Sequence, residues 1–211
     1  MDKLEETARS AQDKLNAAAY RILVCKGTGC LANGAHEVYE ALVKALPSAM
    51  PGSVELSDDG GHHHAGSVSQ TGCHGLGQEG PLVTVRFNCP QRDEILYCRV
   101  KPEDVPKLVE QTIVKGGVVD RLLPVNPETG RPCGKSSEIS FYNRQKRLAL
   151  ADCGHLNPES IDEYVANGGY KTFQHVTTHM SPRQVCDEVV ASGLRGRGGA
   201  GSRQARSGWR C

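Results

Sequence analysis

Two kinds of hydrophobic spacing follow one another along the first half of the chain. The stretches YRILVC, LVTVRF and EILYCRV, at 20–25, 82–87 and 94–100, place apolar residues in alternating or continuous runs bounded by turn residues. Such runs predict β-strands. The shorter SVELS, at 53–57, is predicted to be a further strand, and the polar DDGGHHHAGS that follows it is predicted to be a loop.

Apolar residues at helical spacing occupy three other segments. They predict an amphipathic helix over 2–16, a helix over 35–46 closed by Pro47, and a helix over 102–114 that ends at glycines. The resulting order, β-α-β-β-β-α, fits a small thioredoxin-like α/β domain at 20–118, preceded by an N-terminal helical segment at 1–19.

The composition changes after this domain. Residues 119–140 are rich in Pro, Gly and Ser, which predicts a linker. A helix is predicted in NPESIDEYVANGG, with Asn157 as N-cap and Pro158 at the first helical position. A second is predicted in SPRQVCDEVVASG, where Ser181 and Gln184 form a capping box.

Charge and composition narrow the classes of function. With 25 Lys and Arg against 24 Asp and Glu, the net charge is +1, which offers no strong field for nucleic acid or an anionic membrane. The apolar runs are too short to cross a bilayer, and the first residues lack the apolar core of a signal peptide, so we expect a cytoplasmic protein. Nine cysteines in a reducing compartment favour metal ligands or buried thiols over disulfides.

Three cysteines are candidate metal ligands. Cys25 and Cys30 have C-x4-C spacing in CKGTGC, and Cys73 lies in the glycine-rich TGCHGLG. Iron and zinc favour thiolate sulfur, and glycines let backbone N–H groups approach cluster sulfurs. The alternative is that all three are small buried apolar thiols. The residues alone leave both interpretations open.

The other thiols and histidines give weaker signals. Cys98 lies on a predicted strand and Cys153 and Cys186 lie near predicted helices, so buried thiols are expected there, whereas Cys89 and Cys133 are loop thiols without an assigned role. The run His62 to His64 is interpreted as a solvated loop that binds metal only adventitiously. Adjacent residues rarely ligate one centre together, which argues against His74 beside Cys73 as a ligand.

A glycine-rich loop follows the last predicted helix. In SGLRGRGGAG, glycines would let the backbone wrap a phosphate and arginines would add charge-assisted hydrogen bonds. A flexible terminal tail is the alternative, and the loop is not a P-loop because no Lys-Ser or Lys-Thr follows. The candidate residues are Arg195, Gly196, Arg197, Gly198, Gly199 and Gly201.

Taken together, these stretches resemble one family. LVCKGTGCLANGA, TGCHGL, GPLVTV, YCRVKPEDVP, FYNRQKRLAL, CGHLNPESIDEYVANGGY and SGLRGRGGAG occur in order across most of residues 20–201. They are similar to the N-terminal part of the NADH-binding flavoprotein subunit of NADH dehydrogenase-type complexes. The fused form found in NAD(P)-reducing iron-only hydrogenases, in which a thioredoxin-like [2Fe–2S] domain precedes an FMN- and NADH-binding domain, is the most similar.

The resemblance implies a function in electron transfer. It makes Cys25, Cys30 and Cys73 ligands of a [2Fe–2S] cluster and makes the glycine loop part of an FMN site, with 141–201 as the helical start of an incomplete flavoprotein domain. Hydride from NAD(P)H would pass to FMN and then, as single electrons, to iron–sulfur clusters. The implied partners are other subunits of an NADH dehydrogenase or hydrogenase complex. The alternative function is a non-enzymatic iron–sulfur or zinc-binding docking module.

Two positions depart from the family pattern. Gly77 stands where the family has a fourth cysteine. After GRGGAG the family continues with an aromatic-Pro-Thr-Gly segment and a Lys-Trp pair, whereas this chain reads SRQARSGWRC. One permitted coding of SRQARSG, read with one added base, translates as FPTGKKW. We therefore expect 202–211 to be an aberrant, disordered tail that follows a frameshift, and we expect the chain alone not to complete the full reaction.

Overall fold

The computed structural model describes residues 3–49, 66–89, 92–148 and 150–195. Contacts between Cα atoms divide the chain into two compact units, Met1–Ala166 and Asn167–Cys211. The predicted strand at 53–57, the histidine run and the tail at 202–211 lie outside the described residues.

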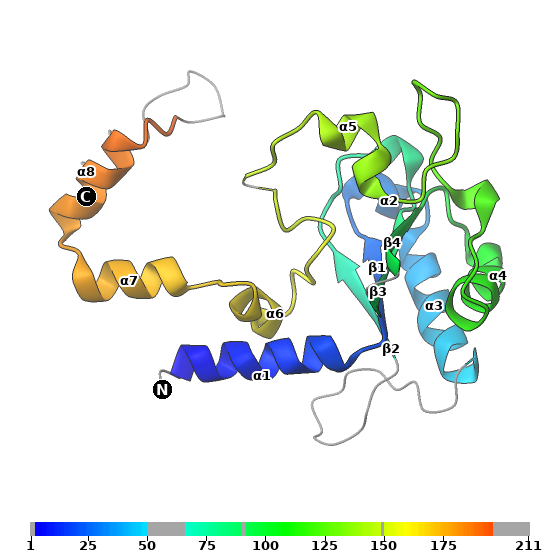
Figure 1. The fold of residues 1–211 in the computed structure, drawn as a ribbon, viewed down its shortest axis with the longest axis horizontal. Coiled ribbons are helices and arrows are strands. Elements are labelled where there is room, and N and C mark those ends of the chain that lie inside the picture. Colours follow the sequence, from blue (N-terminus) through cyan, green and yellow to red (C-terminus); the bar gives the residue numbers. More distant parts are fainter. Residues whose placement is uncertain (1–2, 50–65, 90–91, 149, 196–211) are drawn as a thin grey trace. The chain divides into compact units, whose positions relative to one another are not determined.

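The first unit holds the sheet and most of the helices (Figure 1). Its strands are β1 (Tyr20–Cys25), β2 (Gly66–Thr71), β3 (Val83–Cys89) and β4 (Arg92–Tyr97). Its α-helices are α1 (Lys3–Ala17), α2 (Thr28–Ala32), α3 (Ala35–Ala49), α4 (Val105–Leu108), α5 (Ser140–Asn143) and α6 (Ile161–Ala166). Short 3₁₀ turns are η1 (Gly77–Glu79), η2 (Pro102–Asp104), η4 (Asp120–Leu122) and η5 (Ser136–Glu138), and a π-helical turn, η3, covers Val109–Val114.

The four strands form one mixed sheet in the order β2-β1-β3-β4. β1 runs parallel to β2, with Cys25 opposite Thr71, and antiparallel to β3, which pairs antiparallel with β4. A parallel βαβ unit followed by an antiparallel hairpin and a helix is the thioredoxin-like topology that the strand and helix order predicts.

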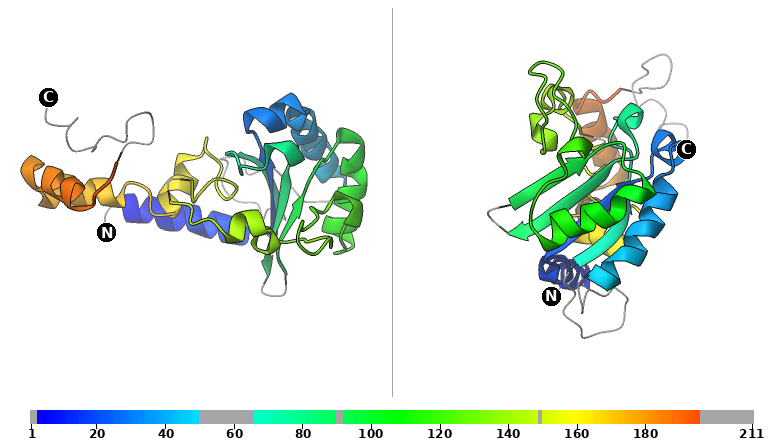
Figure 2. Two further views of the ribbon diagram at one scale, coloured as in Figure 1. Left: turned by 90° about the horizontal axis from the view of Figure 1, so that it is seen from above. Right: turned by 90° about the vertical axis from the view of Figure 1, so that its right-hand side faces the viewer.

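Alternation along β1 and β3 decides which side chains form the main core. Ile22 and Val24 pair with Val85 and Val83 in the register, and all four are buried in the same cluster. Helix α3 contributes apolar residues at helical spacing to that cluster, Val38, Leu42 and Leu46. In Figures 1 and 2, α3 and α4 cover one face of the sheet.

The opposite face of the sheet carries polar side chains that are nevertheless half-buried. Arg21 and Arg86 are register partners on this face, and each pairs with a carboxylate. The Arg21 guanidinium lies 2.7 Å from the Glu163 carboxylate of α6, and Arg86 lies 3.0 Å from Glu94. Helix α1 packs along α6, so the N-terminal helix is held to the same unit.

The second strand differs from the prediction. The sequence pattern places part of 66–71 in a polar loop, yet these residues form β2 along the whole length of β1. GSVSQT has no apolar alternation that could identify it, because Val68 is its only large apolar residue. Pairing with β1 supplies the backbone hydrogen bonds that propensity alone does not predict.

Two predicted helix ends are also corrected. Helix α3 continues through Pro47 to Ala49. Helix α6 begins at Ile161, so Asn157 is not its N-cap: the Asn157 side-chain oxygen instead accepts a hydrogen bond from the Glu159 N–H, and the Ser160 hydroxyl accepts one from the Glu163 N–H. The predicted helix over 102–114 is divided among η2, α4 and η3.

The segment predicted as a linker is not an open connection. Leu122, Leu123 and Cys133 are buried in the main core, and Cys98 donates its N–H to the Leu122 carbonyl. The contacts divide the chain after Ala166 rather than within 119–140. The assignment of 141–201 to a flavoprotein domain stays a prediction.

The second unit has two described helices, α7 (Lys171–His179) and α8 (Pro182–Ala191). The capping box is confirmed: the Ser181 hydroxyl accepts from the Gln184 N–H, and the Gln184 side chain accepts from the Ser181 N–H. The hydrophobic pattern does not predict helix α7. Large apolar side chains such as Phe173 and Val190 are exposed.

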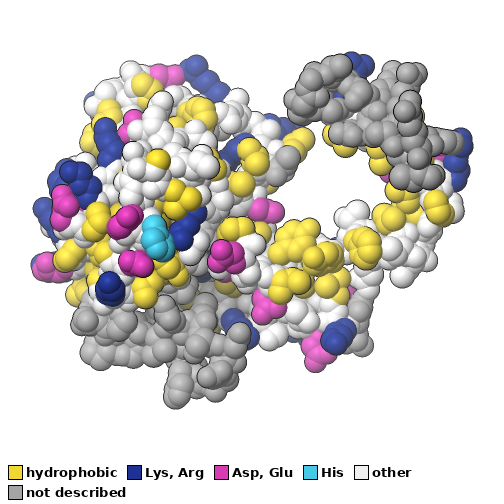
Figure 3. Space-filling view, turned by 180° about the vertical axis from the view of Figure 1, so that it is seen from behind, with side chains coloured by type: hydrophobic (Ala, Val, Ile, Leu, Met, Phe, Trp, Pro, Cys, Tyr) yellow, Lys and Arg dark blue, Asp and Glu magenta, His cyan; other side chains and the backbone are white. Residues whose placement is uncertain are grey.

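The described surface agrees with the balanced charge. On the face drawn in Figure 3, positive and negative side chains intermingle over the sheet-containing unit. Among the described residues, no helix is long and apolar enough to cross a membrane.

Candidate metal centre

The register of the sheet brings the candidate ligands together at the carboxyl ends of β1 and β2. Cys25 is the last residue of β1, and its register partner Thr71 ends β2 two residues before Cys73. Because β1 and β2 are parallel, their following loops emerge at the same end of the sheet. The loop after β1 leads at once into α2, which carries Cys30. The fold thus places three thiols, from two loops, at one end of two adjacent strands.

Glycines allow these two loops to approach each other. A Cβ added to Gly27 would lie 2.8 Å from the Cys73 sulfur, and one added to Gly80 would lie 2.6 Å from the Cys30 sulfur. Real Cβ atoms do not come so close, so both positions need glycine for steric reasons. The glycine-rich sequence around the cysteines therefore serves close contact between backbone and sulfur.

The thiols interact directly with one another. The Cys30 thiol donates to Cys25, and this hydrogen bond, with a smaller one from Cys73, lowers the pKa of Cys25 to about 6. The same contact with Cys25 raises the pKa of Cys30. The pair therefore holds one thiolate, at Cys25, close to neutral pH.

Backbone N–H groups surround the sulfurs. Those of Gly27 and His74 donate to Cys25 and help to lower its pKa, and that of Leu82 donates to Cys30. The Gly75 N–H lies 3.4 Å from the Cys73 sulfur. Such donors stabilise negative charge on sulfur and tune the potential of iron–sulfur centres.

The three thiols differ in their access to solvent. Cys25 and Cys30 are buried, whereas Cys73 is exposed. A group held by all three would have one side inside the protein and one side at the surface. That arrangement suits exchange of electrons, which requires close approach but no entry of a substrate.

Gly77 lies beside this group at the start of η1. Among the described residues, the only neighbour that an added Cβ would meet within 4 Å is the Gly29 Cα, at 3.8 Å, an ordinary contact. Its backbone φ is not positive, so a side chain would cause no strain. Gly29 directly precedes Cys30, which places position 77 next to the helix that carries one of the thiols.

In the part of the chain that the structure describes, no group of three or more His, Cys, Asp or Glu has the arrangement of a metal site. Cys25, Cys30 and Cys73 are close neighbours, but their role as ligands stays a prediction. Within the glycine loop only Arg195 is described, and it is exposed. The loop's other candidate residues, like the side chain of Cys89, lie outside the described residues.

The surroundings of His74 argue against a role as an exposed ligand. It is buried, and burial lowers its pKa to about 4, so the ring is neutral. Its Nε2 atom has no hydrogen-bond partner among the described residues, and its ring contacts Gly154, where an added Cβ would lie 2.5 Å from the His74 Cε1 atom. Of the other thiols, Cys98 and Cys133 are buried and Cys153 and Cys186 are half-exposed.

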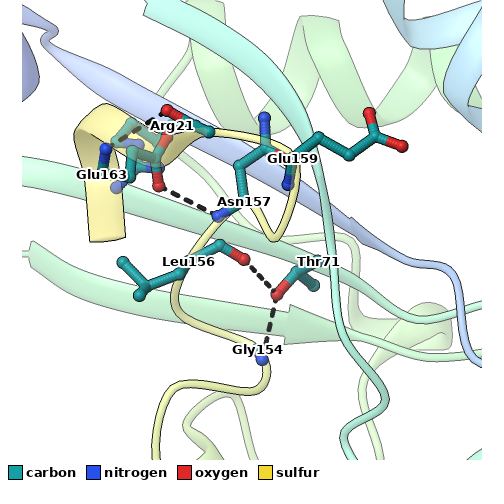
Figure 4. A network of polar contacts seen from close by, with 8 residues as sticks. Arg21, Thr71, Gly154, Leu156, Asn157, Glu159 and Glu163 are labelled. Atoms are coloured by element: carbon teal, nitrogen blue, oxygen red, sulfur yellow. Dashed lines mark hydrogen bonds and ion pairs between the residues drawn. The ribbon is translucent and has the colours of Figure 1, made fainter. Parts of the chain in front are cut away.

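A third segment reaches this edge of the sheet, and the sequence does not reveal it. The Thr71 hydroxyl donates to the Leu156 carbonyl at 2.8 Å and accepts from the Gly154 N–H at 3.0 Å (Figure 4). The same loop is fixed further along, where the Asn157 N–H donates to the Glu163 carboxylate that binds Arg21. Neither hydrophobic pattern nor spacing indicates the Thr71 contacts, since they join residues more than 80 positions apart.

Comparison with known proteins identifies relatives over part of the chain. No family model matches. The NADP-reducing hydrogenase subunit HndC of Solidesulfovibrio fructosivorans is 53% identical over 58 residues, which are 28% of this chain and 12% of that protein. An NADH-quinone oxidoreductase subunit of Aquifex aeolicus is 52% identical over 42 residues, 20% of this chain and 10% of that protein. This chain is a partial homologue of these two proteins.

The homology confirms the family resemblance, and the chain spans about a tenth of the length of the curated relatives it matches. Among solved structures, a thioredoxin-like [2Fe–2S] ferredoxin from Aquifex aeolicus matches 50% of this chain and 89% of its own, with 27% identity and a TM-score of 0.38.

Proposed function

We propose that the chain is an electron-transfer segment of an NAD(P)H oxidoreductase, with an iron–sulfur cluster held by Cys25, Cys30 and Cys73. The observation that carries the proposal is the set of three neighbouring thiols, in which Cys25 contacts both Cys30 and Cys73, and whose sulfurs accept backbone N–H groups. The relatives' names, a hydrogenase subunit that reduces NADP and a quinone oxidoreductase subunit that uses NADH, support the choice of redox partner.

The residues fit a [2Fe–2S] group in chemistry and in surroundings. Such a group is held by thiolates and, when bound, would accept and return one electron at a time. The lowered pKa of Cys25 favours its thiolate form, and thiols bind iron as thiolates. The N–H groups of Gly27, His74 and Gly75 would stabilise the charge on the sulfurs. Cys73 would form the face exposed to an electron partner.

The remaining family properties belong to the same proposal. The loop Arg195 to Gly201 would supply part of an FMN site, and other subunits of a hydrogenase or NADH dehydrogenase complex would be the partners, in the cytoplasm. A complete flavin site needs apolar walls on several sides. We therefore expect this chain to bind FMN weakly at most.

Anaerobic reconstitution tests the proposal. The purified chain is incubated with iron and sulfide, desalted, and assayed for iron, acid-labile sulfide, visible absorption and, after reduction, electron paramagnetic resonance. We expect a two-iron signal that Cys25→Ser abolishes and that Cys186→Ser, a half-exposed thiol of α8, leaves unchanged. A protein that stays colourless and binds zinc instead would favour a docking module. Equal iron in all three proteins would refute the proposed ligands.

A further inference from the structure

A two-iron cluster takes four protein ligands, and the proposed site supplies only three. Gly77 has no side chain to offer. With three thiolates, one iron would keep a coordination position open to solvent or oxygen. A fourth thiol near the same loops would change this, and the structure brings one there from a distant part of the chain.

Cys153 is that thiol. Its sulfur lies 3.1 Å from the point where a Cβ on Gly72 would be, and the carbonyl oxygen of Gly72 lies 3.7 Å from the Cys25 sulfur. Gly72 is also the residue before Cys73. A single glycine therefore touches the thiols of Cys25 and Cys153 and is covalently joined to Cys73. Since Cys153 is half-exposed and not in a disulfide, its sulfur is available.

The loop that carries Cys153 is fixed to the loop that carries Cys73. Gly154 donates its N–H to the Thr71 hydroxyl, and Thr71 lies two residues before Cys73. On the other side of Cys73, the His74 ring packs against Gly154 so closely that a Cβ there would overlap the ring. Gly154 has a φ of +89°, which favours glycine at this contact. Figure 4 shows the anchoring of the loop on Thr71.

We propose that Cys153 is the fourth thiolate of the iron–sulfur site, in place of the side chain that Gly77 lacks. This rests on the proposed function. As the bond from the Cys153 sulfur to iron forms, the sulfur supplies both bonding electrons and its proton passes to solvent. No oxidation state changes in this step. His74 is a poorer fourth ligand because it adjoins Cys73, and its ring is packed on Gly154.

The test compares four full-length proteins after the same anaerobic reconstitution: the parent, Cys153→Ser, Gly77→Cys, and the double variant. Iron, sulfide and the half-life of the visible absorption in air are measured, with far-ultraviolet circular dichroism to establish that each is folded. Cys186→Ser is the matched thiol control. We expect Cys153→Ser to shorten the cluster half-life at least about tenfold. We expect Gly77→Cys to remove that dependence, so that the double variant holds its cluster like Gly77→Cys alone.

A second variant displaces the Cys153 sulfur without removing it. In Gly72→Ala the new methyl group would meet the Cys153 sulfur at 3.1 Å, so the sulfur must move by a few tenths of an ångström. The cluster half-life should fall in this variant but not in Gly72→Ala combined with Gly77→Cys. A general structural defect would shorten it in both.

The results separate this inference from the proposed function. Equal iron content and half-life in the parent and Cys153→Ser would overturn the role of Cys153 while leaving the cluster in place. A cluster in Gly77→Cys but not in the parent would also overturn it, and would count against cluster binding by the parent chain as well. Failure of every variant, Gly77→Cys included, to bind iron and sulfide would overturn both.

Discussion

The Thr71 hydroxyl offers the sharpest test of how the third segment is held at the candidate site. Thr71→Val keeps the shape of the side chain but removes the hydroxyl, which donates to the Leu156 carbonyl and accepts from the Gly154 N–H. Thr71 is fully buried and Gly154 is buried, so the Gly154 N–H that loses its acceptor cannot form a hydrogen bond with water instead.

The expected loss follows from these two contacts. A buried polar group left without a partner costs about 1–3 kcal/mol. The Gly154 N–H should cost an amount within this range, whereas the Leu156 carbonyl, on a half-buried residue, should cost less. We expect the free energy of unfolding of the first unit to fall by about 2–4 kcal/mol in total. With a urea dependence of about 2 kcal/mol per molar, the midpoint should fall by about 1–2 M.

The measurement is urea unfolding followed by far-ultraviolet circular dichroism. Thr129→Val is the matched control, because the Thr129 hydroxyl also accepts a backbone N–H, from Arg131, but at an exposed position where water can replace it. The control should change the stability by less than about 0.5 kcal/mol. If Thr71→Val behaved like the control, the two hydrogen bonds would not hold the 153–156 loop, and the reasoning about the third segment would fail.

Three further predictions concern the same unit. In the Cys153→Ser background, Gly77→Cys should give a more oxygen-resistant cluster than Cys153→Ser alone, because among the described residues the added side chain meets only the Gly29 Cα, at 3.8 Å; equal iron, sulfide and cluster lifetime would contradict this. Gly154→Ala should lower the free energy of unfolding in urea by more than Gly130→Ala. Both glycines have positive φ, but of the two only Gly154 packs against the His74 ring; equal losses of stability would show that the ring moves aside without cost. Burial raises the pKa of Glu94, but the Ser136 hydroxyl and Arg86 together lower it by more, so the pKa lies below its usual value of 4.5. The ionised Glu94 carboxylate therefore stabilises the fold above about pH 4.5, and this stabilisation is lost as the pH falls further. Glu94→Gln should therefore flatten the acid limb of a stability–pH profile, and an unchanged limb would argue against this pairing.

The parts of the fold that sequence predicts are those with strong apolar periodicity. β1, β3, β4, α1 and α3 are all predictable, because each carries a regular set of apolar side chains. β2 is not, because GSVSQT forms a strand through pairing with β1 rather than through its own side chains. Composition is misleading at 119–140, where prolines and glycines occur in a segment that nevertheless buries Leu122 and Leu123.

The candidate site divides in the same way. Cys25, Cys30 and Cys73 can be named from the sequence because they lie in short glycine-rich motifs, and the register of β1 with β2 then brings their loops together. Cys153 carries no comparable signal, as its approach depends on the two hydrogen bonds of Thr71. Contacts over more than 80 residues leave no periodic trace, so only the folded chain reveals them.

The long sequence separation of the Thr71 contacts also determines when the candidate site can be completed during protein synthesis. The strand that ends at Thr71 leaves the ribosome well before the loop at 154–156, which lies 83 to 85 residues later. At about 5–20 residues per second, the thiols of the first two loops would wait several seconds for the third segment to arrive. During that interval the candidate site lacks the later loop and its Cys153 thiol. A cluster inserted before the 153–156 loop has folded would lack one of its proposed ligands. We therefore expect iron and sulfide to be inserted only after the nascent chain has passed residue 156.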